Sequence, residues 1–279
     1  MEIEIRGHRC VYERVGDGPD LTLLHSVGLS TREGWRYQIP LLATRFTVLS
    51  YDFRGLGQSE RGNEPLGVAT FVRDLRALLR ALGISRTVLM GVSLGGFVAQ
   101  AFALEHPNMV RAMVLVSTAS RIFPAVAPAR ERRNETVRRL GMAAVTDQQM
   151  ASHFSREFAR THPDVMAWYE EHYLANDPAH YAEIMDDLGA FDSSDRLGTL
   201  SCPTLVMAGG ADRAAVAGSA PLESATNLHR LLAGSELATF PDAHHYPHLD
   251  HVNAFNARML AFLNRAVPEE TTSARPEPR

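Results

Sequence analysis

The amino-acid sequence predicts a doubly wound α/β sheet, in which short buried strands alternate with amphipathic helices. Six short apolar runs each end in a turn, which is typical of parallel strands that are buried on both faces. These runs are Leu21–Leu24, Thr47–Tyr51, Thr87–Val92, Val110–Val116, Thr204–Ala208 and Glu236–Phe240. Helical periodicity lies between them, most clearly over Thr70–Leu82, Phe97–Glu105 and Val252–Leu263.

The alternation is modified at both ends and interrupted once. Residues 2–15 alternate apolar and polar side chains around Gly7, which predicts an antiparallel hairpin. Between Arg121 and Arg196 the sequence is helix-prone and contains no strand pattern, so we expect a helical insertion. Its Arg130–Arg139 charge run also holds Glu131 and Glu135, and is therefore expected to be a solvated helix face.

These features divide the 279 residues into four segments. We expect the first part of an α/β core over 1–120, a helical cap over 121–196 and the second part of the core over 197–267. The remaining residues, 268–279, are rich in Pro, Glu, Thr and Ser, and a disordered tail is expected there.

Composition excludes several classes of function. All 28 basic residues are arginines, so the chain lacks the lysine of a Walker-type phosphate loop, of a pyridoxal Schiff base or of a lysine general base. The net charge of −4 gives no electrostatic reason to expect binding to nucleic acid or to an anionic membrane. Cys10 and Cys202 cannot form a disulfide framework or a metal finger. With no apolar leader and no run of 18 apolar residues, we expect a cytoplasmic protein.

The strand over Thr87–Val92 runs directly into a pattern that suits a catalytic serine. The residues Gly91-Val92-Ser93-Leu94-Gly95 form G-x-S-x-G, followed by a helix. This is the context of a nucleophile elbow, in which a tight turn projects the serine hydroxyl above the sheet edge. Gly91 and Gly95 would supply the space that such a turn needs. The helix after Ser93 also points its positive end at the site.

An acid and a base follow in the order that a serine hydrolase needs. Asp212 comes after the strand Thr204–Ala208, and His244 and His245 come after Glu236–Phe240. The carboxyl ends of parallel strands share one edge of a sheet. A histidine there could serve as general base for Ser93, with Asp212 orienting its ring.

With these motifs the chain resembles the α/β-hydrolase family along nearly its whole length. The stretch from His25 to Gly28 and the D-x-R-G-x-G-x-S turn from Asp52 to Ser59 are both similar to family signatures. The resemblance implies an oxyanion hole made by the backbone N–H groups of Val27 and Leu94. Ser26 stands where glycine is usual, but a backbone donor needs no particular side chain.

The resemblance also bears on the roles of neighbouring residues. The family pattern Gly-His-x-Pro places the catalytic imidazole at His245 and His244 at the glycine position, while Asp242 and Asp250 are fallback candidates for the acid. Asp52 and Arg54 would build a turn. No clean zinc-site spacing is present, so we expect no metal, and His248 and His251 are expected near the pocket rim.

Together, these residues predict a serine hydrolase that cleaves a carboxylic ester or lactone without a cofactor or metal. The insertion resembles the cap of 3-oxoadipate enol-lactonase-like hydrolases, and a small-molecule substrate is expected. Candidate substrate-binding residues are His25, Arg133, Trp168 and Tyr169. Three alternatives stay open: a carbon–carbon bond hydrolase, a cofactor-free perhydrolase, and a small-molecule receptor that keeps the hydrolase fold. The oligomeric state is not predicted.

Overall fold

The computed structural model describes residues 1–122, 126–213 and 221–268. Its centre is an eight-stranded sheet with the strand order β1-β2-β4-β3-β5-β6-β7-β8. The strands are β1 (Glu2–Ile5), β2 (His8–Val15), β3 (Asp20–Leu24), β4 (Thr47–Tyr51), β5 (Thr87–Val92), β6 (Val110–Val116), β7 (Thr204–Gly209) and β8 (Glu236–Phe240).

The sheet is parallel except at its N-terminal edge. Strand β2 pairs antiparallel with both β1 and β4, whereas β4, β3, β5, β6, β7 and β8 pair parallel with one another in that order. The predicted hairpin and the predicted mostly parallel sheet are therefore confirmed. The strand bounds agree with the sequence patterns to within one residue at each end.

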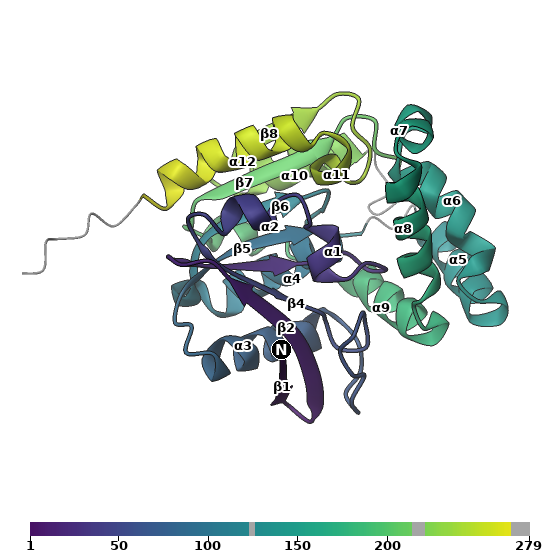
Figure 1. The fold of residues 1–279 in the computed structure, drawn as a ribbon, viewed down its shortest axis with the longest axis horizontal. Coiled ribbons are helices and arrows are strands. Elements are labelled where there is room, and N and C mark those ends of the chain that lie inside the picture. The colour runs from purple at the N-terminus through teal and green to yellow at the C-terminus, as the bar shows by residue number, and fades with distance from the viewer. Residues whose placement is uncertain (123–125, 214–220, 269–279) are drawn as a thin grey trace, which may run out of the picture.

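Helices surround the sheet, and Figure 1 shows α3 and α12 on opposite sides of it. The helices before β6 are α1 (Thr31–Gly34), α2 (Ile39–Leu42), α3 (Val68–Ala81) and α4 (Leu94–Glu105). Those between β6 and β7 are α5 (Ala127–Leu140), α6 (Ala143–His153), α7 (Arg156–Thr161), α8 (Pro163–Leu174) and α9 (Pro178–Ala190). Those after β7 are α10 (Pro221–Leu231), α11 (Pro247–Asp250) and α12 (Val252–Ala266).

Helix α3 shows how a periodic pattern becomes a packed element. Phe71, Leu75 and Leu78 share one face and are fully buried. The helix starts two residues earlier than its periodicity predicts because the Asp187 carboxylate of α9 accepts a hydrogen bond of 2.7 Å from the Val68 N–H. An acidic group at a helix N-terminus accepts a hydrogen bond from an otherwise unpaired N–H group, and its negative charge interacts favourably with the helix dipole.

The predicted helical insertion is confirmed as α5–α9, which Figure 1 shows gathered at one side of the molecule. Arg132, Glu135 and Arg139 of α5 are exposed, in agreement with a solvated face. The segment bounds 121–196 stay a prediction. Of the expected tail, 268–279, all but Pro268 lies outside the described residues.

A buried ion pair fixes the turn after β4. Arg54 is fully buried, and its guanidinium donates two hydrogen bonds of 2.8 Å to the Asp74 carboxylate of α3. The Asp52 carboxylate accepts hydrogen bonds from the backbone N–H groups of Thr31 and Gln58, each 2.9 Å long. The predicted turn-building role of Asp52 and Arg54 is therefore confirmed.

We expect Asp74→Asn to lower the free energy of unfolding by about 3–5 kcal/mol, because it leaves the buried Arg54 charge without a counter-charge. Urea denaturation at neutral pH measures the loss. The control is Glu157→Gln, which neutralises an exposed partner of Arg160 and should cost less than about 1 kcal/mol. Equal losses in the two variants would contradict the account of this turn.

Candidate active site

Ser93 occupies a strained turn between β5 and α4. Its φ of 52° and ψ of −114° lie outside the backbone regions that non-glycine residues favour. Its N–H donates a hydrogen bond of 2.9 Å to the Val116 carbonyl of β6. A Cβ at Gly91 would collide with the Gly95 carbonyl, and one at Gly95 would collide with the Leu24 carbonyl. The two glycines therefore allow the close backbone approach that the G-x-S-x-G pattern predicts.

Two backbone N–H groups are candidate oxyanion donors, one directly after Ser93 and the other in the loop that follows β3. Leu94 is the first residue of α4, so its N–H lies at the positive end of that helix. Val27 belongs to the loop that follows β3. Across the described ranges, neither N–H donates a hydrogen bond to another residue. These are the two groups that the family resemblance assigns to an oxyanion hole.

The loops after β7 and β8 are joined by backbone hydrogen bonds. The Gly210 N–H donates to the Phe240 carbonyl at 2.8 Å, and the Ala211 N–H donates to the Ala243 carbonyl at 3.0 Å. This junction brings the next side chains together: His245 Nδ1 lies 2.8 Å from Asp212 Oδ2. Both side chains are buried, with 2% of each exposed. A buried carboxylate bonded to Nδ1 leaves Nε2 as the ring nitrogen that can accept a proton.

The neighbouring histidine is held differently. The His244 N–H donates to the Asp250 carboxylate at 3.1 Å, and that carboxylate also lies 2.9 Å from His251 Nδ1. Burial raises the pKa of Asp250. Asp242 is exposed. The structure therefore pairs Asp212 with His245, while Asp250 holds the turn that carries both histidines.

His25 is a fully buried anchor of the first loop. Its Nδ1 bonds the Ser26 carbonyl at 2.8 Å, and its Nε2 accepts a hydrogen bond of 2.9 Å from the Phe53 N–H. Both ring nitrogens thus hold backbone in place, which favours a positioning role for His25 over contact with a substrate. The Ser26 hydroxyl lies 3.1 Å from the Tyr246 hydroxyl, which links this loop to the histidine loop.

His153, at the end of α6, contacts the candidate base and is not among the residues predicted from the sequence. The His153 carbonyl accepts a hydrogen bond of 3.1 Å from the His245 N–H. The two imidazole rings stack with centroids 4.7 Å apart. His153 Nδ1 lies 2.6 Å from the Tyr169 hydroxyl, and burial holds the pKa of His153 well below its usual value. No local motif marks a histidine in a helical insertion as a neighbour of a distant loop.

The other candidate substrate-binding residues are dispersed. Tyr169 is fully buried, and its hydroxyl contacts His153. Trp168 is half-buried beneath the Arg36 guanidinium, whose central carbon lies 3.8 Å from the ring centroid. Arg133 lines a separate cavity between α5 and α6. Their predicted contact with a substrate stays a prediction.

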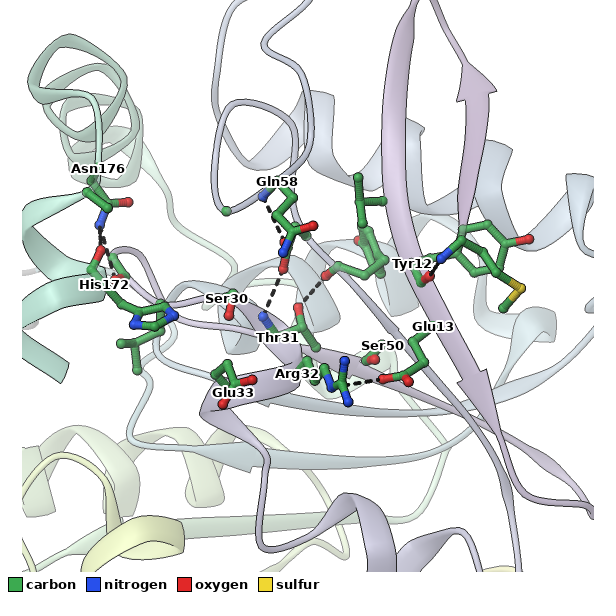
Figure 2. Close-up of a pocket in the computed structure, with 18 residues that line it drawn as sticks. Tyr12, Glu13, Ser30, Thr31, Arg32, Glu33, Ser50, Gln58, His172 and Asn176 are labelled. Atoms are coloured by element: carbon green, nitrogen blue, oxygen red, sulfur yellow. Dashed lines mark hydrogen bonds and ion pairs between the residues drawn. The ribbon is translucent and has the colours of Figure 1, made fainter. Parts of the chain in front are cut away.

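A cavity of about 400 Å³ adjoins the first loop (Figure 2). Gly28 of that loop and Thr31 at the start of α1 line it on one side, and His172 and Asn176 line it from the insertion. The Asn176 amide donates to the Gly28 carbonyl at 3.1 Å, which ties α8 to the loop. Ser93, Asp212 and His245 do not line this cavity, so it is not the place where Ser93 would meet a substrate.

The expectation that His248 lies near a pocket rim is wrong. His248 is fully buried, with its ring 4.6 Å from that of Trp35 and 5.8 Å from that of Phe255. Burial, with a smaller contribution from His245, lowers its pKa to about 3. The proline before it starts the short helix α11, which turns this side chain into the core.

Comparison with known proteins decides the family. A family model described as the alpha/beta hydrolase fold matches residues 21–252. The chain belongs to the α/β-hydrolase family. A provisionally named carbamate hydrolase, RutD of Caulobacter sp. (strain K31), is 29% identical over 91% of this chain and 96% of its own length.

Solved structures of other α/β-hydrolases superimpose closely on this one. An esterase from Thermogutta terrifontis, with malate bound, is 27% identical, with a TM-score of 0.87 over 95% of this chain and 99% of the esterase. The enol-lactonase from Burkholderia xenovorans LB400 is 26% identical, with a TM-score of 0.86 over 95% of this chain and 100% of the lactonase. These relatives support a hydrolase. Among the described residues of this α/β-hydrolase, no helix has the length and apolar character to cross a membrane.

We expect acid to weaken the fold through His248. Its folded pKa of about 3 lies below the ordinary value of 6.5, so the unfolded chain binds a proton first as the pH falls. The stability from keeping the ring neutral is complete above pH 6.5 and is lost toward pH 3, at about 1.4 kcal/mol for each pH unit. Denaturant titrations at pH 7 and pH 5 should show about 2 kcal/mol less acid loss in His248→Phe than in the wild type. The same loss in both proteins would contradict this assignment.

Proposed function

We propose that the protein is a serine hydrolase that cleaves a carboxylic ester or lactone through an acyl-enzyme on Ser93. The observation that carries the proposal is the buried hydrogen bond of 2.8 Å between His245 Nδ1 and Asp212 Oδ2. It lies at the sheet edge where β5 delivers Ser93 in a strained turn. The order serine, acid, histidine along the chain is that of the α/β-hydrolase family.

The reaction would proceed in two halves. His245 Nε2 takes the proton of Ser93 Oγ as that oxygen attacks the carbonyl carbon, and the resulting oxyanion accepts hydrogen bonds from the Leu94 and Val27 N–H groups. The alcohol leaves with the proton from His245, so an acyl group remains on Ser93. A water molecule, deprotonated by His245, then attacks the acyl carbon, and Ser93 recovers its proton as the acid is released. Asp212 stabilises the protonated ring in both halves.

An ester or lactone is the substrate class that the comparisons favour. An esterase and an enol-lactonase match nearly the full length of this chain. The RutD relative carries the name of a carbamate hydrolase, so a carbamate is a necessary member of any substrate panel. A small-molecule substrate and the cytoplasmic location expected from the sequence are part of the proposal.

We expect Ser93→Ala to abolish turnover of 4-nitrophenyl acetate, 4-nitrophenyl butyrate and a γ-lactone, with kcat reduced at least about 10⁴-fold, because no other group supplies the nucleophile. Initial rates with an aryl carbamate in the same panel separate ester from carbamate specificity. The preferred substrate identifies the class.

The matched control is Ser117→Ala. Ser117 follows the neighbouring strand β6 and is as buried as Ser93, but the proposal gives it no chemical role. Its activity should stay within about twofold of the wild type. Turnover that survives in Ser93→Ala would refute the nucleophile assignment. Loss of activity in both variants, with the fold intact by circular dichroism, would show that the effect is not specific to Ser93.

A further inference from the structure

A second cavity, of about 340 Å³, lies between α5 and α6 of the insertion. Four arginines line it: Arg130, Arg132 and Arg133 from α5, and Arg213, which follows Asp212 in the chain. No acidic side chain is among the described residues of the lining. Such a concentration of positive charge repels itself and favours an anion.

The four arginines lack an ion-pair partner within the described part of the chain, although Glu131 and Glu135 lie on α5. None of them forms an ion pair there, whereas Arg138 of the same helix pairs with Asp186. The Nε atoms of Arg130 and Arg133 are also buried without a hydrogen-bond partner. Because these two nitrogens are covered by protein atoms, they are not available to a ligand in the cavity, and it is the lack of paired acidic groups that favours an anion.

Two further polar side chains line the cavity while being more than nine-tenths buried. Gln149 is 8% exposed, and its side-chain amide makes no hydrogen bond to any described residue. His153 is 7% exposed, and its Nδ1 is occupied by the Tyr169 hydroxyl. The Gln149 amide is therefore left to face a ligand beside the arginines.

The size and the apolar part of the lining indicate an organic ligand. The volume exceeds the needs of a single inorganic ion. Val126, Ala129 and Val145 contribute apolar surface. A guanidinium binds a carboxylate through two parallel hydrogen bonds, which makes arginine suited to this group.

We propose that this cavity binds a small organic carboxylate, with Arg133 holding the carboxylate and Gln149 donating a further hydrogen bond. The site is distinct from the place of acyl transfer, because Ser93, Asp212 and His245 are not in its lining. It adjoins that place through His153, whose ring stacks on that of His245 and whose carbonyl accepts a hydrogen bond from the His245 N–H. The proposal does not rest on the proposed function.

The test is calorimetric titration of the Ser93→Ala protein. This variant keeps the cavity, and because it should not turn over a substrate, the titration measures binding alone. Glutarate and benzoate are the probes, at constant ionic strength in chloride. Glutaramide is the neutral counterpart of glutarate, and inorganic phosphate is the competing anion. We expect saturable binding of at least one carboxylate and none of glutaramide.

Three variants in the same background locate the site. Arg133→Met removes one charge and keeps the apolar stem, and Gln149→Leu removes the neutral donor without changing the charge. Each should weaken carboxylate binding about tenfold or more. Arg139→Met makes the same charge change on the exposed face of α5, where Arg139 forms no ion pair with any described residue, and should leave the affinity within about twofold.

The possible results separate clearly. Weakening in Arg133→Met and Gln149→Leu, but not in Arg139→Met, supports the site. Equal weakening in Arg133→Met and Arg139→Met would mean a general charge effect and overturn it. Absence of binding by both carboxylates, or phosphate binding tighter than either, would overturn the carboxylate assignment. None of these results depends on whether Ser93 is the nucleophile.

Discussion

Two backbone hydrogen bonds between the loops after β7 and β8 are the constraint on which the candidate site depends. They run from Gly210 to Phe240 and from Ala211 to Ala243, directly beyond the paired strands. Because these bonds set the distance between the loops, the Asp212 carboxylate and the His245 ring meet. Parallel pairing of β7 with β8 thus becomes a side-chain geometry that suits proton transfer.

The insertion also contributes to this geometry. His153 accepts a hydrogen bond from the His245 backbone and stacks on the His245 ring, so the end of α6 limits how that ring can move. On the other side, Asn176 ties α8 to the loop that carries Val27. The helices between β6 and β7 therefore hold both the candidate base and the candidate oxyanion loop. A change in the packing of these helices would therefore alter the positions of His245 and of the loop that carries Val27.

The parts of this molecule that sequence predicts best are those with local causes. Strands such as Thr47–Tyr51 and Val110–Val116 are apolar runs bounded by turns, and the elbow around Ser93 is marked by the glycines that it requires on either side. Features with distant causes were missed or misplaced. Helix α3 begins at Val68 because Asp187 reaches it from α9. His248 packs against Trp35 and Phe255, and the pattern of apolar residues around His248 does not indicate this burial.

The most direct test of the central claim is covalent labelling with a fluorophosphonate, followed by intact mass measurement and peptide mapping. Such a reagent phosphonylates a serine that an adjacent base has activated. The account predicts one adduct per chain, mapped to Ser93, with the labelling rate strongly reduced in His245→Gln and Asp212→Asn. An adduct on another residue, or labelling of Ser93 at an unchanged rate in His245→Gln, would contradict the claim that His245 and Asp212 activate Ser93.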